Sequence, residues 1–133
     1  MTLIAAHRVQ SPSLAMADTL AATDVTVSLE RTRTTASGRC RLHFWVSGSD
    51  LDGFERALTT DDTVSGVTRL DDDSDERLYS VHADPTRTLA AAGEEFEATW
   101  LTLRYADDWW YGESRFPDAD ALDGYRAWLD DRD

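Results

Sequence analysis

The sequence predicts an α+β domain with an antiparallel sheet that begins as a ferredoxin-like split β-α-β sandwich. Apolar and polar residues alternate over 24–30 and again over 39–46, which is the period of half-buried strands. Apolar residues recur at helical spacing over 14–21 and 51–58, so each stretch predicts an amphipathic helix. With flanking strands on either side, the order becomes strand, helix, strand, strand, helix, strand, as in that sandwich.

The first lobe of the domain is expected to span about residues 1–83. The turn-rich stretch 34–38 joins the two clearest strands into a hairpin, and Ser49 or Asp50 can cap the helix that follows. The elements expected here are, in order, a strand over 2–10, a helix from Ser11-Pro12 to about Thr23, strands over 24–30 and 39–46, a helix from Leu51, an irregular strand through Val64, Val67 and Leu70, an acidic loop over 71–76 and a strand over 77–83.

A second lobe, about residues 84–133, repeats this theme and stops one strand short of a complete unit. Asp118 suits the N-cap of a final helix. The expected elements are a helix from Asp84-Pro85 to Phe96, a strand with Leu101, Leu103 and Tyr105, a turn at Asp107-Asp108, a strand over 109–116, and a helix with Leu122, Tyr125, Trp128 and Leu129 on its core side. No Pro- or Gly-rich linker separates the lobes, so we expect one domain over 1–133.

The charge of the chain is extreme. Its 133 residues include 26 acids and 13 bases, for a net charge of −13; every base is Arg, Lys is absent, and Asp outnumbers Glu by 19 to 7. Self-repulsion of this size destabilises a compact chain in dilute buffer, whereas in molar salt the Debye length falls to about 3 Å and screens it. The composition therefore predicts a halophilic protein, since an acidic mesophilic protein would not explain the missing Lys.

The same charge restricts the possible partners. Phosphate binding weakens steeply as salt rises, so we expect no direct nucleic acid binding and no membrane partner. The single cysteine, Cys40, excludes an internal disulfide and fits a reducing compartment. No apolar run approaches the about 18 residues of a membrane span, and the amino terminus does not resemble a signal peptide. These features predict a cytoplasmic protein.

Patterns for catalysis or metal binding are missing from the sequence. An EF-hand loop starting at Asp71 would need Gly at its sixth position and an acid at its twelfth, where the chain has Glu76 and His82. Cys40 and His43 are three residues apart on one predicted strand, so they point to opposite faces. Motifs for a nucleophile elbow, a phosphate loop or dinucleotide binding do not occur. We expect no catalytic residue, no metal and no cofactor.

One stretch of this acidic chain is positively charged. No acid occurs from Arg31 to Ser49, and Arg side chains grip carboxylates with a planar fork. The candidate anion or partner patch comprises Arg31, Arg33, Arg39, Arg41, His43 and Trp45. The alternative is a hairpin tip whose arginines pair with the surplus carboxylates of the protein itself.

A second candidate surface is aromatic. Trp109 and Trp110 are adjacent on a predicted strand and must face opposite sides. The candidate aromatic interface comprises Trp100, Trp109, Trp110 and Tyr111. These side chains could form a stacking platform or a subunit interface, since aromatic residues anchor interfaces, or the last helix could cover them.

Several stretches resemble the amino-terminal domain of haloarchaeal regulators of the bacterio-opsin activator type. The most specific is FWVSGSDLDGFE over 44–55; the others are LIAA over 3–6, DVTVSLE over 24–30, RLY over 77–79 and RFPD over 115–118. The resemblance implies a sensory or regulatory module that precedes a helix-turn-helix domain, sometimes with a GAF domain, and it implies no catalytic residues. The chain stops at Asp133, so it resembles a stand-alone or truncated relative without the DNA-binding helices.

These observations favour a non-enzymatic regulatory, sensory or protein-interaction module. It would act through a protein partner or a small-molecule ligand. An exposed edge strand of an incomplete second lobe would favour a homodimer. The alternatives are a small enzyme on a ferredoxin-like scaffold, which needs an enclosed pocket with a polar group of perturbed pKa, and a structural partner subunit.

Overall fold

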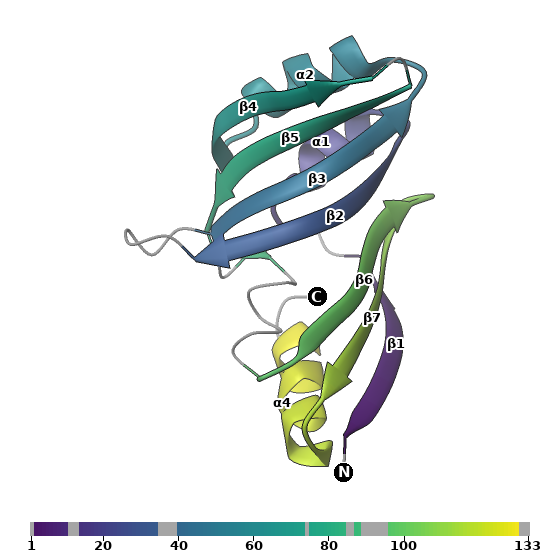
Figure 1. The fold of residues 1–133 in the computed structure, drawn as a ribbon, viewed down its shortest axis with the longest axis vertical. Helices are drawn as coiled ribbons and strands as arrows, with labels where there is room; N and C mark the ends of the chain where they lie inside the picture. The colour runs from purple at the N-terminus through teal and green to yellow at the C-terminus, as the bar shows by residue number, and fades with distance from the viewer. Residues whose placement is uncertain are drawn as a thin grey trace.

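The computed structural model of the protein describes residues 2–10, 14–34, 40–73, 75–84, 87–88 and 96–130, with the backbone alone for 31–34. Figure 1 shows its strands and helices. The strands are β1 (Leu3–Val9), β2 (Val25–Thr34), β3 (Cys40–Gly48), β4 (Val64–Asp72), β5 (Glu76–Ala83), β6 (Thr99–Ala106) and β7 (Trp109–Phe116). The helices are α1 (Ala17–Ala22), α2 (Leu51–Thr59) and α4 (Ala119–Asp130).

The strands form one antiparallel sheet in the order β1-β7-β6-β2-β3-β5-β4, so the predicted α+β class with an antiparallel sheet is confirmed. The sheet falls into two halves (Figure 1). The first half consists of β2, β3, β5 and β4 with α1 and α2, and the second half of β6, β7 and β1 with α4. Between the halves, β2 and β6 pair at Val27–Tyr105 and Ser28–Arg104 within the described residues.

The place of β1 differs from the expected one. β1 pairs with β7 from Leu3–Phe116 to Val9–Trp110, at the outer edge of the second half. The ferredoxin-like arrangement, with this strand inside the sheet of the first lobe, is therefore not confirmed. The physical reason is that His7 of β1 packs between the rings of Trp100 and Tyr125, at centroid distances of 5.7 and 5.4 Å. Alternation predicts a strand but does not specify its partner.

Local signals predicted other elements correctly. β2 and β3 form the expected hairpin, from Val25–Gly48 to Thr34–Cys40. Asp50 caps α2, because its carboxylate accepts a hydrogen bond of 2.9 Å from the amide of Gly53. Asp118 accepts one of 2.8 Å from the amide of Ala121 at the start of α4. Most of the helix predicted over 84–96 lies outside the described residues.

Two strands contain irregularities that change which side chains are buried. The register of β6 against β7 shifts between Trp100 and Thr102, and this shift leaves Leu101 40% exposed although alternation placed it with Leu103 and Tyr105. β4 is irregular as expected, with two register shifts against β5, and Leu70 is 49% exposed.

The core lies on the helix side of the sheet. In the first half, the largest buried side chains pack between the strands and the two helices: Tyr79, Phe44, Phe54, Leu20 and Leu58. In the second half, Phe116 and Tyr125 form a smaller cluster beneath α4. Within the described part of the chain, no helix has the length and apolar character needed to cross a membrane.

Candidate functional site

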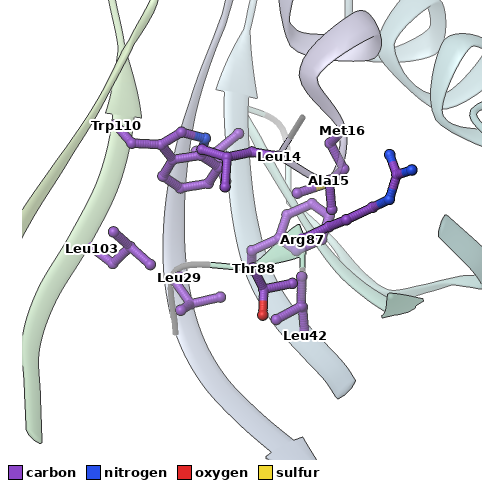
Figure 2. A pocket seen from close by; sticks show the side chains of 11 residues that line it. Leu14, Ala15, Met16, Leu29, Leu42, Arg87, Thr88, Leu103 and Trp110 are labelled. Carbon is purple, nitrogen blue, oxygen red and sulfur yellow. The ribbon is translucent and has the colours of Figure 1, made fainter. Parts of the chain in front are cut away.

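An apolar pocket lies where the two halves of the sheet meet (Figure 2). Residues of both halves line it: Leu14, Leu29, Leu42, Phe44, Leu103 and Trp110. The cavity among these side chains has a volume of about 30 Å³. The pocket is therefore narrow and suits a small apolar group better than a polar one.

The two halves contribute walls from separate strands. Leu29 of β2 faces Leu103 of β6, and Trp110 of β7 lies beside Leu14 (Figure 2). The backbone of the segment before α1 is held in place by a hydrogen bond of 2.7 Å from the amide of Ala15 to the carbonyl of Arg87. Side chains of both halves thus surround the junction at which β2 and β6 share two described ladder pairs.

The polar part of the described lining is limited to Arg87 and Thr88. The guanidinium of Arg87 extends away from Leu103 and Trp110 (Figure 2). Thr88 is buried. An Arg does not exchange protons near neutral pH, so the described lining offers binding surface but no acid–base chemistry.

Trp110 separates this pocket from a second hollow. The indole packs edge-on against Tyr105, with ring centroids 5.5 Å apart. Its other side borders a hollow lined by Gln10, Leu20 and residues of α1. Trp110 therefore lines both spaces.

The predicted Arg patch lies on the open face of the first half, opposite α1 and α2, as far as it is described. Side chains on β3 alternate, so Arg41, His43 and Trp45 are more exposed than the buried Cys40 and Leu42. The backbones of Arg31 and Arg33 pair with those of His43 and Arg41. The side chains of Arg31 and Arg33 and the whole of Arg39 lie outside the described residues.

Within this patch the contacts of two side chains are defined. Arg41 Nε donates a hydrogen bond of 3.2 Å to Nε2 of His82 on the neighbouring strand β5. Trp45 Nε1 donates one of 2.6 Å to a carboxylate oxygen of Glu30. Arg41 forms no ion pair with any carboxylate of the described residues.

The four aromatic residues of the predicted interface lie on both faces of the second half. Trp100 faces α4 and packs against His7 and Tyr125, and Trp110 lines the pocket. Trp109 lies under the guanidinium of Arg8, whose Cζ is 4.6 Å from the ring centroid, and Tyr111 is 40% exposed. Trp109 and Tyr111 therefore lie on the open face of the sheet, and Trp100 and Trp110 lie on the helix side.

A buried polar contact lies beneath α4. Tyr125 Oη and His7 Nε2 are 3.2 Å apart. Burial lowers the pKa of His7 and raises the pKa of Tyr125, so both side chains are neutral at pH 7. The described residues contain no cluster of three or more potential metal ligands, and this pair is not part of one.

Sequence reasoning did not identify the pocket. Leu14, Leu29 and Leu103 are ordinary core leucines in the sequence, and they come together because β6 pairs with β2. Trp110 was singled out, although as part of an aromatic surface. No local pattern reports a contact between residues some seventy positions apart, so the sequence alone held no signal for this site.

The chain is thus a small α+β domain whose apolar pocket has no acid–base group among its described lining residues. The family model of the BAT domain, described as the GAF and HTH_10 associated domain, matches residues 6–109. The chain belongs to this family, the amino-terminal regulatory domains of bacterio-opsin activator-like regulators. No curated protein and no solved structure gives a significant match. The family is regulatory and is not a known enzyme family.

Proposed function

We propose that this domain is a non-enzymatic sensory module that binds a small apolar molecule in the pocket between its two halves. The observation that carries the proposal is the composition of that pocket, with leucines and Trp110 from both halves around one space. Apolar walls with few polar groups are typical of small-molecule sites. Membership of a regulatory family supports a role in which binding is reported to another part of a regulator.

Binding at this position would have a direct effect on the molecule. The two halves share two described ladder pairs and the apolar contacts around Leu29, Leu103 and Trp110. A ligand that fills the space adds contacts to both halves at once. It therefore favours whichever relative orientation of the halves fits it, and the population shifts toward that orientation.

The test uses xenon, a small apolar atom that enters dry apolar cavities, together with two variants of β6. Leu103→Phe fills the pocket, whereas Leu101→Phe places the same ring at an exposed position two residues away. We expect xenon to raise the unfolding temperature of the wild type and of Leu101→Phe, but not of Leu103→Phe. Equal responses of the two variants, or no response of the wild type, would contradict the proposal.

A second candidate function is docking of an acidic protein segment on the open face of the first half. The observation that favours it is Arg41, which has no described carboxylate partner although acids outnumber bases two to one. Arg56 is exposed on α2, across the sheet, and is a matched control. Recovery of a partner at high salt should fall for Arg41→Glu and persist for Arg56→Glu. Equal recovery would remove the patch from consideration.

We also propose that the module works at high salt in a haloarchaeal cytoplasm and does not contact DNA itself. The support is the net charge of −13 with Arg as the sole base. Such a surface repels phosphates, and counterion release contributes little to binding at molar salt.

A further inference from the structure

The two edges of the sheet are built differently. β4, at one edge, has two register shifts against β5, a left-handed Gly66 with φ of 59°, and the acids Asp71 and Asp72. Bulges and charges of this kind prevent another strand from pairing with an edge. β1, at the other edge, pairs with β7 through seven consecutive residues without a register shift.

β1 also lacks the acidic residues that would hinder its pairing with another strand. The first acid of this acidic chain is Asp18, so β1 contains none, and its sequence is LIAAHRV. No described element lies beyond β1 in Figure 1. A regular, apolar strand with one row of unpaired backbone groups is a template for pairing with a further strand.

The outward side chains of β1 give the edge a defined chemistry. Ile4, Ala6 and Arg8 alternate with more buried neighbours on the open face. Ile4 is 62% exposed, the highest value among the described large apolar residues. Arg8 lies over the ring of Trp109 and forms no ion pair with a described carboxylate. The edge therefore presents one apolar position and one cationic position, two residues on either side of Ala6.

We infer that β1 pairs in antiparallel register with β1 of a second copy of this chain, with the twofold axis at Ala6. In this register Ile4 lies opposite Arg8 of the partner subunit, and Ala6 opposite Ala6 of the partner subunit. Ile4 then covers the aliphatic part of the Arg8 side chain of the partner subunit, and the guanidinium of that Arg8 stacks on Trp109 of its own subunit.

Charge does not oppose a second copy in this register at high salt. The two Arg8 side chains are four residues apart along the paired strands, or about 13 Å at a rise of about 3.3 Å per residue. That separation exceeds the Debye length of about 3 Å at molar salt, so they do not repel each other. Because the contact is isologous, it joins two copies and no more. The two sheets become one continuous sheet, and a β4 strand with its bulges and charges forms each end. The inference does not depend on the apolar pocket.

The first test is the mass in solution, by sedimentation equilibrium in about 2–4 M salt, where the surface charge is screened. We expect the wild type at twice the chain mass of 14.9 kDa and Ile4→Asp at the chain mass, with unchanged circular dichroism. Leu70→Asp changes an exposed apolar residue at the other edge and should remain dimeric. A monomeric wild type, or a dimer that Ile4→Asp leaves intact, would overturn the inference.

The second test determines the register. In a Cys40→Ser background, Ala6→Cys places two thiols across the proposed axis, where opposite Cβ atoms are about 4.5–5.5 Å apart and a disulfide is within reach of small adjustments. Thr102→Cys is exposed on the same face, two strands inward, and serves as the control. Mild oxidation should link Ala6→Cys into a covalent dimer and leave Thr102→Cys unlinked. Equal linkage of both variants would exclude this register.

Discussion

The two halves of the sheet reach stability by different routes. The first half distributes its core over several buried side chains between four strands and two helices. In the second half one ring is central, because Tyr125 contacts the rings of His7, Phe96, Trp100, Phe116 and Trp128. A core of many modest contacts tolerates the loss of one, whereas a cluster around a single residue does not.

The buried hydroxyls show the same contrast. Tyr79 donates a hydrogen bond of 3.0 Å to Glu55, a carboxylate that Arg69 also contacts at 3.2 Å. Tyr125 and His7 contact each other at 3.2 Å beneath α4. Loss of the Tyr79 hydroxyl leaves Glu55 paired with Arg69, whereas loss of the Tyr125 hydroxyl leaves a ring nitrogen of His7 without its buried partner.

The largest expected effect is that of salt. Below about 0.1 M salt the Debye length exceeds about 10 Å, and repulsion among the surplus acids acts on the whole chain. We expect the cooperative fold to be lost, with amide exchange rising in β1, β6 and β7 before β3 and β5. Hydrogen exchange over a salt series measures this order. A protein fully folded without added salt would contradict the halophilic interpretation.

Among single substitutions, removal of the Tyr125 ring should show most clearly that the two halves differ in stability. Tyr125→Ala deletes a fully buried aromatic ring and should cost about 3–5 kcal/mol of unfolding free energy. Tyr111→Ala, at an exposed position of the same half, should cost less than about 1 kcal/mol. Denaturant unfolding gives the totals, and hydrogen exchange shows where protection is lost. Equal loss of protection in both halves would mean that they unfold as one unit.

Deletion of one tyrosine hydroxyl in each half, with the ring kept, compares the two buried hydrogen bonds directly. Tyr125→Phe should cost about 1–3 kcal/mol, because His7 loses its buried partner, whereas Tyr79→Phe should cost about 1 kcal/mol, because Glu55 keeps its arginine. The two substitutions remove the same atom, so each is the control for the other in denaturant unfolding. The reverse order of costs would show that the Glu55 network matters more than the contact beneath α4.

The smallest effect concerns pH. Burial lowers the pKa of His7 below its ordinary 6.5, so the unfolded chain binds this proton more readily than the folded one. The stability contributed by neutral His7 is present above pH 6.5 and is lost as the pH falls below that value. We expect a lower unfolding temperature at pH 5.5 than at pH 7.5, and a smaller difference for His7→Gln. An unchanged pH dependence in His7→Gln would contradict this role.

The parts of the fold that sequence reasoning predicted are those with local causes. The β2–β3 hairpin follows from alternation on both sides of a turn, and the caps at Asp50 and Asp118 follow from side chains three residues before the amides they accept from. The pairing of β1 with β7 was missed because it depends on how His7 fits among Trp100 and Tyr125. Alternation is the same whichever partner a strand takes.

The candidate site was less predictable for a related reason. Arg41, His43 and Trp45 lie where alternation put them, on the open face of β3. The pocket instead depends on the junction of β2 with β6, where Leu29 and Leu103 meet. A bulge also moved Leu101 away from the face that alternation assigned to it. Irregularities and long-range pairings carry no short-range signature in one sequence.

The pairing of β1 with β7 has a consequence for synthesis. Leu3 leaves the ribosome more than a hundred residues before its partner Phe116. At about 5–20 residues per second, this delay is about 5–20 s. The first half can form in that interval from neighbouring segments, whereas the second half must wait until β7 and α4 have been translated. Nascent chains stalled before Trp109 should therefore contain a folded first half and an unpaired amino-terminal strand.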